Sequence, residues 1–312
     1  MPRISVIIPT YNSAATVVQS LMSVIEQTRS PDEIIISDNH STDSTVKLIE
    51  QVIYKNTDIP ITLTYCSSQG AGPNRNHAVS KSQFEVLAFL DADDRWDKNF
   101  LETMTENPIT DNLIRGSYAR YINPFGHIYG ASIRSKNDLS AKSRMLKRGV
   151  MPFLLSTWII KRKTFCELNG FDSEFVTSQD AEFLYRFLSS GGNLEVVRQQ
   201  LITYLIHEAS KTTNMHFKQK LTLKYILIRK KSNYINLQEY LDINSTNWNS
   251  IFQSKSDILI RRFITSNKSQ RYNGIYLLFF AFLFSPIRFL SKIWLQRPSK
   301  GAKIFSFKSV IK

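Results

Sequence analysis

Cysteine, glycine, proline and long apolar runs are all scarce in this chain of 312 residues. The two cysteines, Cys66 and Cys166, lie 100 positions apart, which excludes a framework of several disulfides and a cysteine-rich metal site. Eleven glycines and ten prolines exclude a collagen-like or low-complexity chain. The longest apolar run, Ile275–Phe284, is half of the roughly 20 residues that a membrane-spanning helix needs.

The N-terminus shows no export signal. Its apolar run Ile4–Ile8 is interrupted by Ser5 and ends at Pro9, which is too short for the core of a signal peptide. Two cysteines allow one disulfide, but so few of them favour free thiols in a reducing compartment. We therefore expect a cytosolic protein.

Acidic residues are scarce in the last third of the chain. Residues 201–312 hold 19 Lys and Arg against 4 Asp and Glu, whereas residues 1–200 hold 21 against 22. This imbalance predicts a near-neutral domain over 1–214 (halves 1–110 and 111–214), followed by a basic helical extension over 215–312. Such an extension should bind an anionic surface, either a membrane or a nucleic acid.

Apolar, aromatic and basic residues mix at 275–294, which is typical of a helix lying in the membrane interface. The alternative for this segment is a buried C-terminal helix packed on the domain.

The first 100 residues alternate between strand-like and helix-like segments. Strands are expected at Ile4–Ile8, Glu33–Ser37, Ile61–Cys66 and Val86–Leu90, and helices at Ala14–Gln27, 44–55 and Asn74–Ser80. This order predicts an α/β fold with a doubly wound, mostly parallel sheet.

Later segments are more mixed. Strands are expected at Leu113–Ile122, Thr157–Ile160, Leu194–Arg198 and Leu201–Ile206, a helix at Asp180–Leu188, and a mobile loop or short helix at 134–149.

Polar clusters follow three of the expected parallel strands. They are Pro9–Asn12, Asp38–Asp43 and Asp91–Asp94. Open α/β sheets bind ligands beyond the carboxyl ends of their strands, so these clusters are candidate site residues. Three carboxylates within Asp91–Asp94 repel one another, and a hard cation such as Mg²⁺ or Mn²⁺ would neutralise them. A solvated turn is the alternative.

Six segments together resemble family 2 glycosyltransferases in their order and spacing. They are Ile4–Asn12, Ile36–Asp43, Gly70–Asn76, Leu90–Asp94, Asn169–Asp172 and Ser178–Arg186. The resemblance covers residues 3 to about 210. It implies a GT-A fold and transfer of a sugar from a nucleotide donor with inversion at the anomeric carbon.

The resemblance also implies roles for single residues. Those that would hold the nucleotide base and ribose are Thr10, Tyr11, Asp38, Asn39 and Arg75. Asp91, Asp93 and Asp94 fall on the metal and donor-sugar motif, with Asp93 and Asp91 as ligands of Mn²⁺ or Mg²⁺. Asp180 falls on the catalytic base. Two positions depart from the commonest pattern: Asn39 stands where a second Asp is frequent, and Gln179 replaces a Glu.

Simpler interpretations of four of these residues remain open. Asp38 could cap the following helix, Tyr11 could be a core aromatic, and Arg75 could be a solvated loop cation. Asp180 could be a helix N-terminal charge favoured by the macrodipole.

The expected function is that of a metal-dependent hexosyltransferase. It would move glucose or galactose from a UDP-sugar to an acceptor such as GlcNAc- or GalNAc-diphosphoundecaprenol, in bacterial O-antigen or other lipopolysaccharide biosynthesis. The protein would lie peripherally on the cytoplasmic face of the inner membrane. Alternatives are a protein, another lipid or a free glycan as acceptor, or a non-catalytic nucleotide- or nucleic-acid-binding protein. Against the last, unneutralised carboxylates would repel phosphates, so we expect no nucleic-acid partner.

Overall fold

A computed structural model describes residues 2–55, 58–122, 128–131, 137–148, 151–173, 175 and 179–205. The chain divides into two compact units, Met1–Arg120 with Ser132–Tyr204, and Tyr121–Ala131 with Leu205–Lys312. The expected extension 215–312 and its segment 275–294 lie outside the described residues, so the boundary at 214 stays a prediction. Among the described residues, no helix combines the length and the apolar character needed to cross a bilayer.

Four parallel strands form the first half of the sheet in the first unit. They are β1 (Ile4–Thr10), β2 (Glu33–Asp38), β3 (Ile61–Tyr65) and β4 (Val86–Phe89), in the order β3-β2-β1-β4. Every residue of β1, β2 and β4 is buried, which explains their near-continuous apolar sequences. The strand order reverses between β1 and β4, and in such sheets ligands bind beyond the carboxyl ends at that point.

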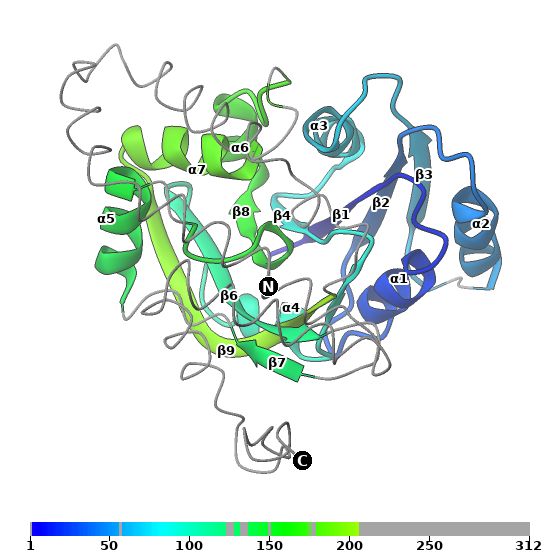
Figure 1. The fold of residues 1–312 in the computed structure, drawn as a ribbon, viewed down its shortest axis with the longest axis horizontal. Helices are drawn as coiled ribbons and strands as arrows, with labels where there is room; N and C mark the ends of the chain where they lie inside the picture. The colour runs from blue at the N-terminus through cyan, green and yellow to red at the C-terminus, as the bar shows by residue number, and fades with distance from the viewer. Residues whose placement is uncertain are drawn as a thin grey trace, which may run out of the picture. The chain divides into compact units, whose positions relative to one another are not determined.

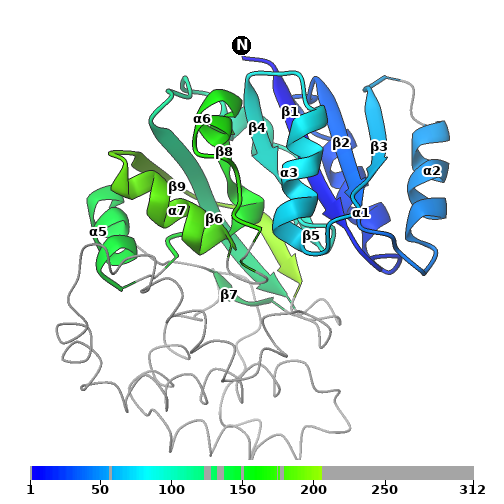
Figure 2. The same ribbon diagram turned by 90° about the horizontal axis from the view of Figure 1, so that it is seen from above.

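Helices cover both faces of the parallel half. They are α1 (Val17–Ile25), α2 (Thr45–Lys55) and α3 (Ala71–Lys81). Figures 1 and 2 show α3 on the opposite face from α1 and α2. This placement follows from right-handed crossovers, because the chain moves outward from β1 to β3 and then back across to β4.

The second half of the sheet is antiparallel. It continues from β4 through β8 (Ile159–Lys161), β6 (Leu113–Ile122), β9 (Asn193–Leu205) and β5 (Asp94–Trp96). The pairs β4–β8, β6–β8 and β5–β9 are all antiparallel. The remaining elements are α4 (Phe100–Met104), β7 (Ile128–Ala131), α5 (Asp138–Arg148), a 3₁₀ turn (Leu155–Thr157), α6 (Arg162–Glu167) and α7 (Gln179–Ser189). The expected α/β sheet is present, with parallel pairing limited to its first half.

Several elements differ from the sequence expectations. One 13-residue strand, β9, replaces the two strands expected at Leu194–Arg198 and Leu201–Ile206, because the polar residues 198–200 between them are exposed strand residues and not a turn. Residues 138–148 form the helix α5, in which Asn137 Oδ1 accepts the Ser140 N–H at 2.7 Å. The short elements β5, α4 and α6 were not expected. Both cysteines are free thiols, as expected.

An aromatic cluster lies beneath the carboxyl end of β4. It contains Phe89, Phe165, Phe171 and Phe183, whose contacting rings lie 5.0–5.8 Å apart between centroids. All four side chains are at most 2% exposed. Aromatic pairs at such spacing contribute about 0.5–1.5 kcal/mol each beyond their area burial. The cluster therefore holds α6 and α7 firmly against the strand that leads to Asp91.

Candidate active site

Hydrogen bonds join the loop after β1 to the loop after β2. Asp38 is fully buried, and its carboxylate accepts hydrogen bonds from Thr10 Oγ1 at 2.9 Å and from the Ser41 backbone N–H at 2.7 Å. The Asn12 N–H donates to Ser41 Oγ at 2.8 Å, while Asn12 Oδ1 accepts the Thr42 N–H at 2.8 Å. These contacts fix a rim at the carboxyl ends of β1 and β2.

The structure of this rim excludes the simpler interpretations of Tyr11 and Asp38. Tyr11 is 55% exposed, so it is not a core aromatic and its ring is free to contact a ligand. Asp38 binds Thr10 and Ser41 and does not cap α2, because Asp43 Oδ1 accepts the Thr45 N–H at 3.0 Å instead. The first helix was expected to begin near Ala14, and this was wrong. Asn12 bonds across to Thr42, and α1 begins only at Val17.

Asn39 joins the same rim to the loop after β3. Its amide Nδ2 donates to the carbonyls of Cys66 at 2.8 Å and Ser68 at 2.9 Å, and its Oδ1 accepts the Gly70 N–H at 3.1 Å. An ionised aspartate has no hydrogen to donate to the two carbonyls. Asn39, in place of the Asp that is frequent at this position, can therefore make the two bonds to these carbonyls, which an aspartate could not make.

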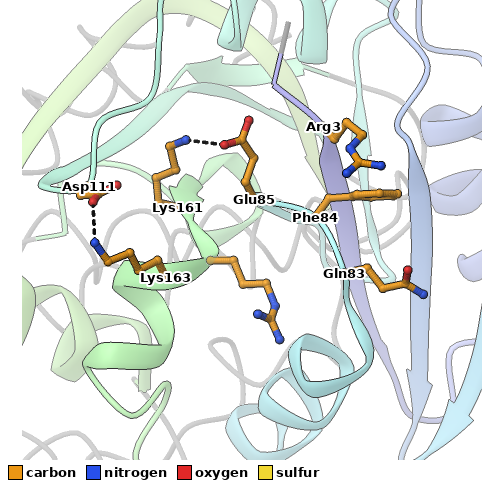
Figure 3. Close-up of a pocket in the computed structure, with 8 residues that line it drawn as sticks. Arg3, Gln83, Phe84, Glu85, Asp111, Lys161 and Lys163 are labelled. Atoms are coloured by element: carbon orange, nitrogen blue, oxygen red, sulfur yellow. Dashed lines mark hydrogen bonds and ion pairs between the residues drawn. The ribbon is translucent and has the colours of Figure 1, made fainter.

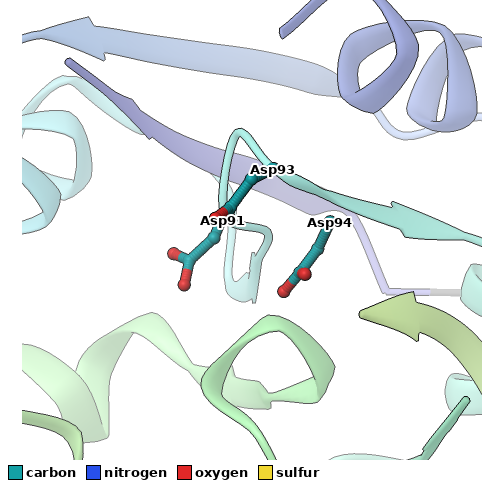
Figure 4. A group of neighbouring side chains, drawn as sticks. All are labelled: Asp91, Asp93 and Asp94. Carbon is teal, nitrogen blue, oxygen red and sulfur yellow. The ribbon is translucent and has the colours of Figure 1, made fainter. Parts of the chain in front are cut away.

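Three carboxylates gather on the turn between β4 and β5 (Figure 4). One oxygen from each of Asp91, Asp93 and Asp94 lies within 4.8 Å of the others. The backbone of Asp91 is held from both sides, since its N–H donates to Ser156 Oγ at 3.1 Å and its carbonyl accepts from Ser20 Oγ at 3.2 Å. A set of oxygen-only donors fits a hard divalent cation such as Mn²⁺ or Mg²⁺.

Arg75 supplies positive charge beside this cluster. It is only 6% exposed and forms a salt bridge with Asp91. Its guanidinium carbon also lies 5.8 Å from the centroid of the Phe171 ring. Arg75 is therefore not a solvated loop cation, and α3 carries it into the same site as the carboxylates.

Asp180 is the second residue of α7, and its Oδ1 accepts the Ala181 N–H at 2.9 Å. It thus has the helix N-terminal position that the simpler interpretation assumed. Burial raises the pKa of this carboxyl, with the charge of Asp91 adding to the rise and that of Arg75 opposing it. The expected base therefore feels the charges of two other expected site residues, and a carboxyl with a raised pKa is better suited to accept a proton.

Sequence reasoning missed two residues that support the site. The Asn74 amide is buried and donates to the backbone carbonyls of Thr10 at 3.2 Å and Ser37 at 2.8 Å. Ser156, also buried, accepts from the Asp91 N–H. Asn74 lies within the motif Gly70–Asn76, so the motif could have indicated it. Nothing in the local sequence marks Ser156, which reaches Asp91 from 65 residues away.

A separate cavity of about 740 Å³ opens at the other end of the strands (Figure 3). Its lining residues precede β1 and β4 or lie on neighbouring segments: Arg3, Gln83, Phe84, Glu85, Asp111, Lys161, Arg162 and Lys163. Its two carboxylates are already paired, Glu85 with Lys161 at 2.8 Å and Asp111 with Lys163 at 3.1 Å. None of the expected site residues lines it, so we place the active site at the carboxyl ends of the strands.

The geometry agrees with the family to which the chain belongs. The model of Glycosyl transferase family 2 matches residues 5–168, more than half of the chain, so this protein is a member of that family. Residues 1–349 of S. aureus TarS in complex with UDP-GlcNAc share the fold, with a TM-score of 0.56 over 94% of this chain and 83% of that chain, at 19% identity. The expected GT-A fold is thereby confirmed.

Two curated relatives each match about a third of the chain. The UDP-Glc:alpha-D-GlcNAc-diphosphoundecaprenol beta-1,3-glucosyltransferase WfgD of Escherichia coli is 33% identical over 111 residues, which is 35% of this chain and 42% of that protein. The GalNAc(5)-diNAcBac-PP-undecaprenol beta-1,3-glucosyltransferase of Campylobacter jejuni is 30% identical over 106 residues, 34% of each chain. The matches cover less than half of the length of both proteins.

We expect Asp93→Ala to weaken Mn²⁺ binding at least tenfold, about 1.4 kcal/mol, because it removes one of three converging carboxylates. Without metal the variant should be no less stable than the native protein, since a like charge is gone. Titration calorimetry with Mn²⁺ measures the affinity. The control is Asp111→Ala, which removes a carboxylate at the far end of the sheet. Unchanged Mn²⁺ affinity in Asp93→Ala, or an equal loss in Asp111→Ala, would contradict the assignment.

Proposed function

We propose that this protein is an inverting, metal-dependent glycosyltransferase that moves a hexose from a UDP-sugar to a lipid-linked sugar acceptor. The observation that carries the proposal is the position of Asp180. Burial raises the pKa of this carboxyl, which also feels the charges of Arg75 and of Asp91, one of the three clustered carboxylates. The candidate base and the candidate cation-binding cluster therefore interact electrostatically.

Inversion is a single displacement, and this chain offers a residue for each task. Asp180 accepts the proton of the acceptor hydroxyl as that oxygen attacks the anomeric carbon from the face opposite the diphosphate. A divalent cation at Asp91 and Asp93 would neutralise the charge that develops on the departing diphosphate. Arg75, already paired with Asp91, adds a fixed positive charge at the same end of the sheet.

The donor would bind along the rim of the strand-end loops. Tyr11 is exposed there, and Thr10, Asp38 and Asn39 are held in one hydrogen-bonded frame beneath it. With Asp94 beside the donor sugar, this frame would form the nucleotide-sugar site. The likeness to the TarS complex with UDP-GlcNAc supports a uridine nucleotide. The name of WfgD supports glucose as the sugar and GlcNAc-diphosphoundecaprenol as the kind of acceptor, with galactose and a GalNAc acceptor as the alternatives to test.

A lipid-linked acceptor requires the enzyme to work at a membrane. The charge of the segment 201–312, with 19 Lys and Arg against 4 Asp and Glu, supports binding to an anionic lipid surface. We therefore propose peripheral attachment at the cytoplasmic face of the inner membrane, within O-antigen or a related polysaccharide pathway. No observation favours a nucleic acid as partner.

Replacing Asp180 with Asn should slow transfer strongly while leaving donor binding intact. The amide keeps the shape of the side chain but cannot accept the proton, and loss of a general base costs about 10²- to 10⁴-fold in rate. Turnover of UDP-glucose with a lipid-diphosphate GlcNAc acceptor, measured together with the Kd of UDP, checks this. An equally large loss of UDP affinity would make Asp180 a donor-binding residue, and undiminished turnover would remove it from the reaction.

The same substitution should stabilise the protein near neutral pH. The pKa of Asp180 is raised in the folded state, so its protonated form is favoured by folding and its contribution to stability is lost as pH rises through that folded pKa. Asp180→Asn stays neutral throughout and avoids this loss. Denaturant unfolding should show the variant more stable at pH 7 and equal to the native protein below the ordinary Asp pKa of about 3.9. A variant less stable than the native protein at pH 7 would mean that the charged carboxylate stabilises the fold.

Deleting residues 273–312 should release the protein from anionic vesicles but leave hydrolysis of UDP-glucose nearly unchanged, because every expected donor-site residue lies before position 181. Each Lys or Arg near an anionic surface contributes about 1 kcal/mol, so binding of the intact chain should weaken with salt. Vesicle co-sedimentation and a hydrolysis assay measure the two properties. An insoluble truncated protein, or one that has lost hydrolysis, would mean that the segment belongs to the core.

A further inference from the structure

The sequence motif Ser178–Arg186 contains two charged residues, Glu182 and Arg186, to which the proposed reaction gives no task. Both lie on α7, the helix that carries Asp180, and they form an ion pair one helical turn apart. Arg186 binds both carboxylate oxygens of Glu182, through Nε and Nη2, each at 2.7 Å. The Glu182 side chain is only 7% exposed. This two-point geometry fixes the plane of the guanidinium.

The same guanidinium holds the loop after α6. Its Nη2 donates to the Gly170 carbonyl at 2.8 Å, and its Nη1 donates to the Leu168 carbonyl. These carbonyls lie just beyond the C-terminus of α6, where backbone acceptors lack partners within the helix and the dipole favours a cation. Asn169 and Gly170 turn the chain there with φ values of 58° and 60°. Arg186 thus joins α7 to the end of α6.

Asn76 binds this loop from the other side. Its Nδ2 donates to the Phe171 carbonyl at 2.6 Å, and its Oδ1 accepts the Phe171 N–H at 2.9 Å. Space is tight at this contact, because a Cβ added to Gly170 would lie 2.6 Å from Asn76 Oδ1. Asn76 directly follows Arg75 on α3, and Arg75 pairs with Asp91. A continuous set of contacts therefore runs from the helix of Asp180 to the carboxylate cluster.

A second contact joins the two helices directly. A Cβ on Gly72, in the first turn of α3, would lie 3.0 Å from the Gln179 side chain, and Gln179 precedes Asp180. Figure 2 shows α3, α6 and α7 on the same face of the sheet. Motion of α7 relative to α3 would therefore disturb the hydrogen bonds of Asn76 and Arg186 as well as this packing.

We propose that Arg186 and Asn76 are positioning residues that set the distance of Asp180 from the donor site, through the loop Leu168–Phe171. This inference rests on the proposed role of Asp180 as the base. Neither residue touches the reacting atoms. Arg186 fixes the orientation of α7, and Asn76 ties the loop to the helix that carries Arg75. A base displaced by about 1 Å can cost on the order of 10²-fold in rate, so loosening this connection should lower kcat.

The test compares Arg186→Lys with a matched arginine. Lysine keeps the charge but cannot bind Glu182 at two points and reach two carbonyls as well. Arg115 is the control, because it also binds one glutamate, Glu195, and backbone carbonyls, those of Met104, Asn107 and Pro108, but none of the expected site residues. We expect Arg186→Lys to lower kcat about 10- to 100-fold with the Kd of UDP changed less than threefold. Arg115→Lys should keep kcat within twofold, measured well below its unfolding temperature.

A second variant breaks the connection at its other end, in case Arg186→Lys does not fold. Asn76→Ala removes both hydrogen bonds to Phe171, and Asn137→Ala, which removes the bond to Ser140 at the start of α5, is its control. Asn76→Ala should likewise lower kcat at least tenfold with UDP affinity retained, while Asn137→Ala should keep kcat within twofold.

Combination with Asp180→Asn separates positioning from general stability. If Arg186 acts through Asp180, the double variant should transfer sugar no more slowly than Asp180→Asn alone. The inference is overturned if kcat of Arg186→Lys and Asn76→Ala stays within twofold of the native value, or if the losses in the double variant multiply. Full transfer by Asp180→Asn would instead overturn the proposed function, and the positioning role with it. If Asp180→Asn loses transfer but Arg186→Lys and Asn76→Ala do not, only the positioning role is overturned.

Discussion

The mutual repulsion of three carboxylates is the constraint on which the rest of the site depends. Oxygens of Asp91, Asp93 and Asp94 lie within 4.8 Å of one another at the end of a buried strand, and Asp94 is itself buried. The buried guanidinium of Arg75 pairs with Asp91 and so offsets part of this repulsion. The hydroxyls of Ser20 and Ser156 hold the Asp91 backbone in place. A bound divalent cation would offset the remaining repulsion.

The loops of the rim and the helix that carries Asp180, the proposed base, are held by different means. The loops after β1, β2 and β3 are held by short side chains bonded to backbone, above all by Asp38 and Asn39. The helix α7, in contrast, packs through an aromatic cluster and is joined to the end of α6 by Arg186. A hydrogen-bonded rim suits recognition of a polar nucleotide, whereas a firmly packed helix suits a group that must be placed accurately for proton transfer.

The parallel half of the fold was predictable because three of its four strands are buried and mostly apolar and its turns are polar. The antiparallel half was harder for identifiable reasons. The strand β5, Asp94–Trp96, begins with two charged residues and forms by pairing with a segment about 110 residues away. Arg115 suggests a solvated charge from sequence, yet it is buried against the carbonyls at the end of α4. Within the candidate site, a sequence motif placed the three carboxylates together, as the structure has them, and the role of Asp180 stays a prediction. The hydrogen-bond partner of Asp38 is Thr10, 28 residues earlier, and such distant partners cannot be inferred from local sequence pattern.

The proposed reaction is a single in-line displacement with Asp180 as base, and the configuration of its product distinguishes it from a reaction with retention. The native protein is incubated with Mn²⁺, UDP-α-D-glucose or UDP-α-D-galactose and a lipid-diphosphate GlcNAc acceptor, and the anomeric proton of the new linkage is examined by NMR. One displacement inverts the anomeric carbon, so we expect a β-linked product. An α-linked product would contradict it, because retention requires chemistry other than one base-assisted displacement.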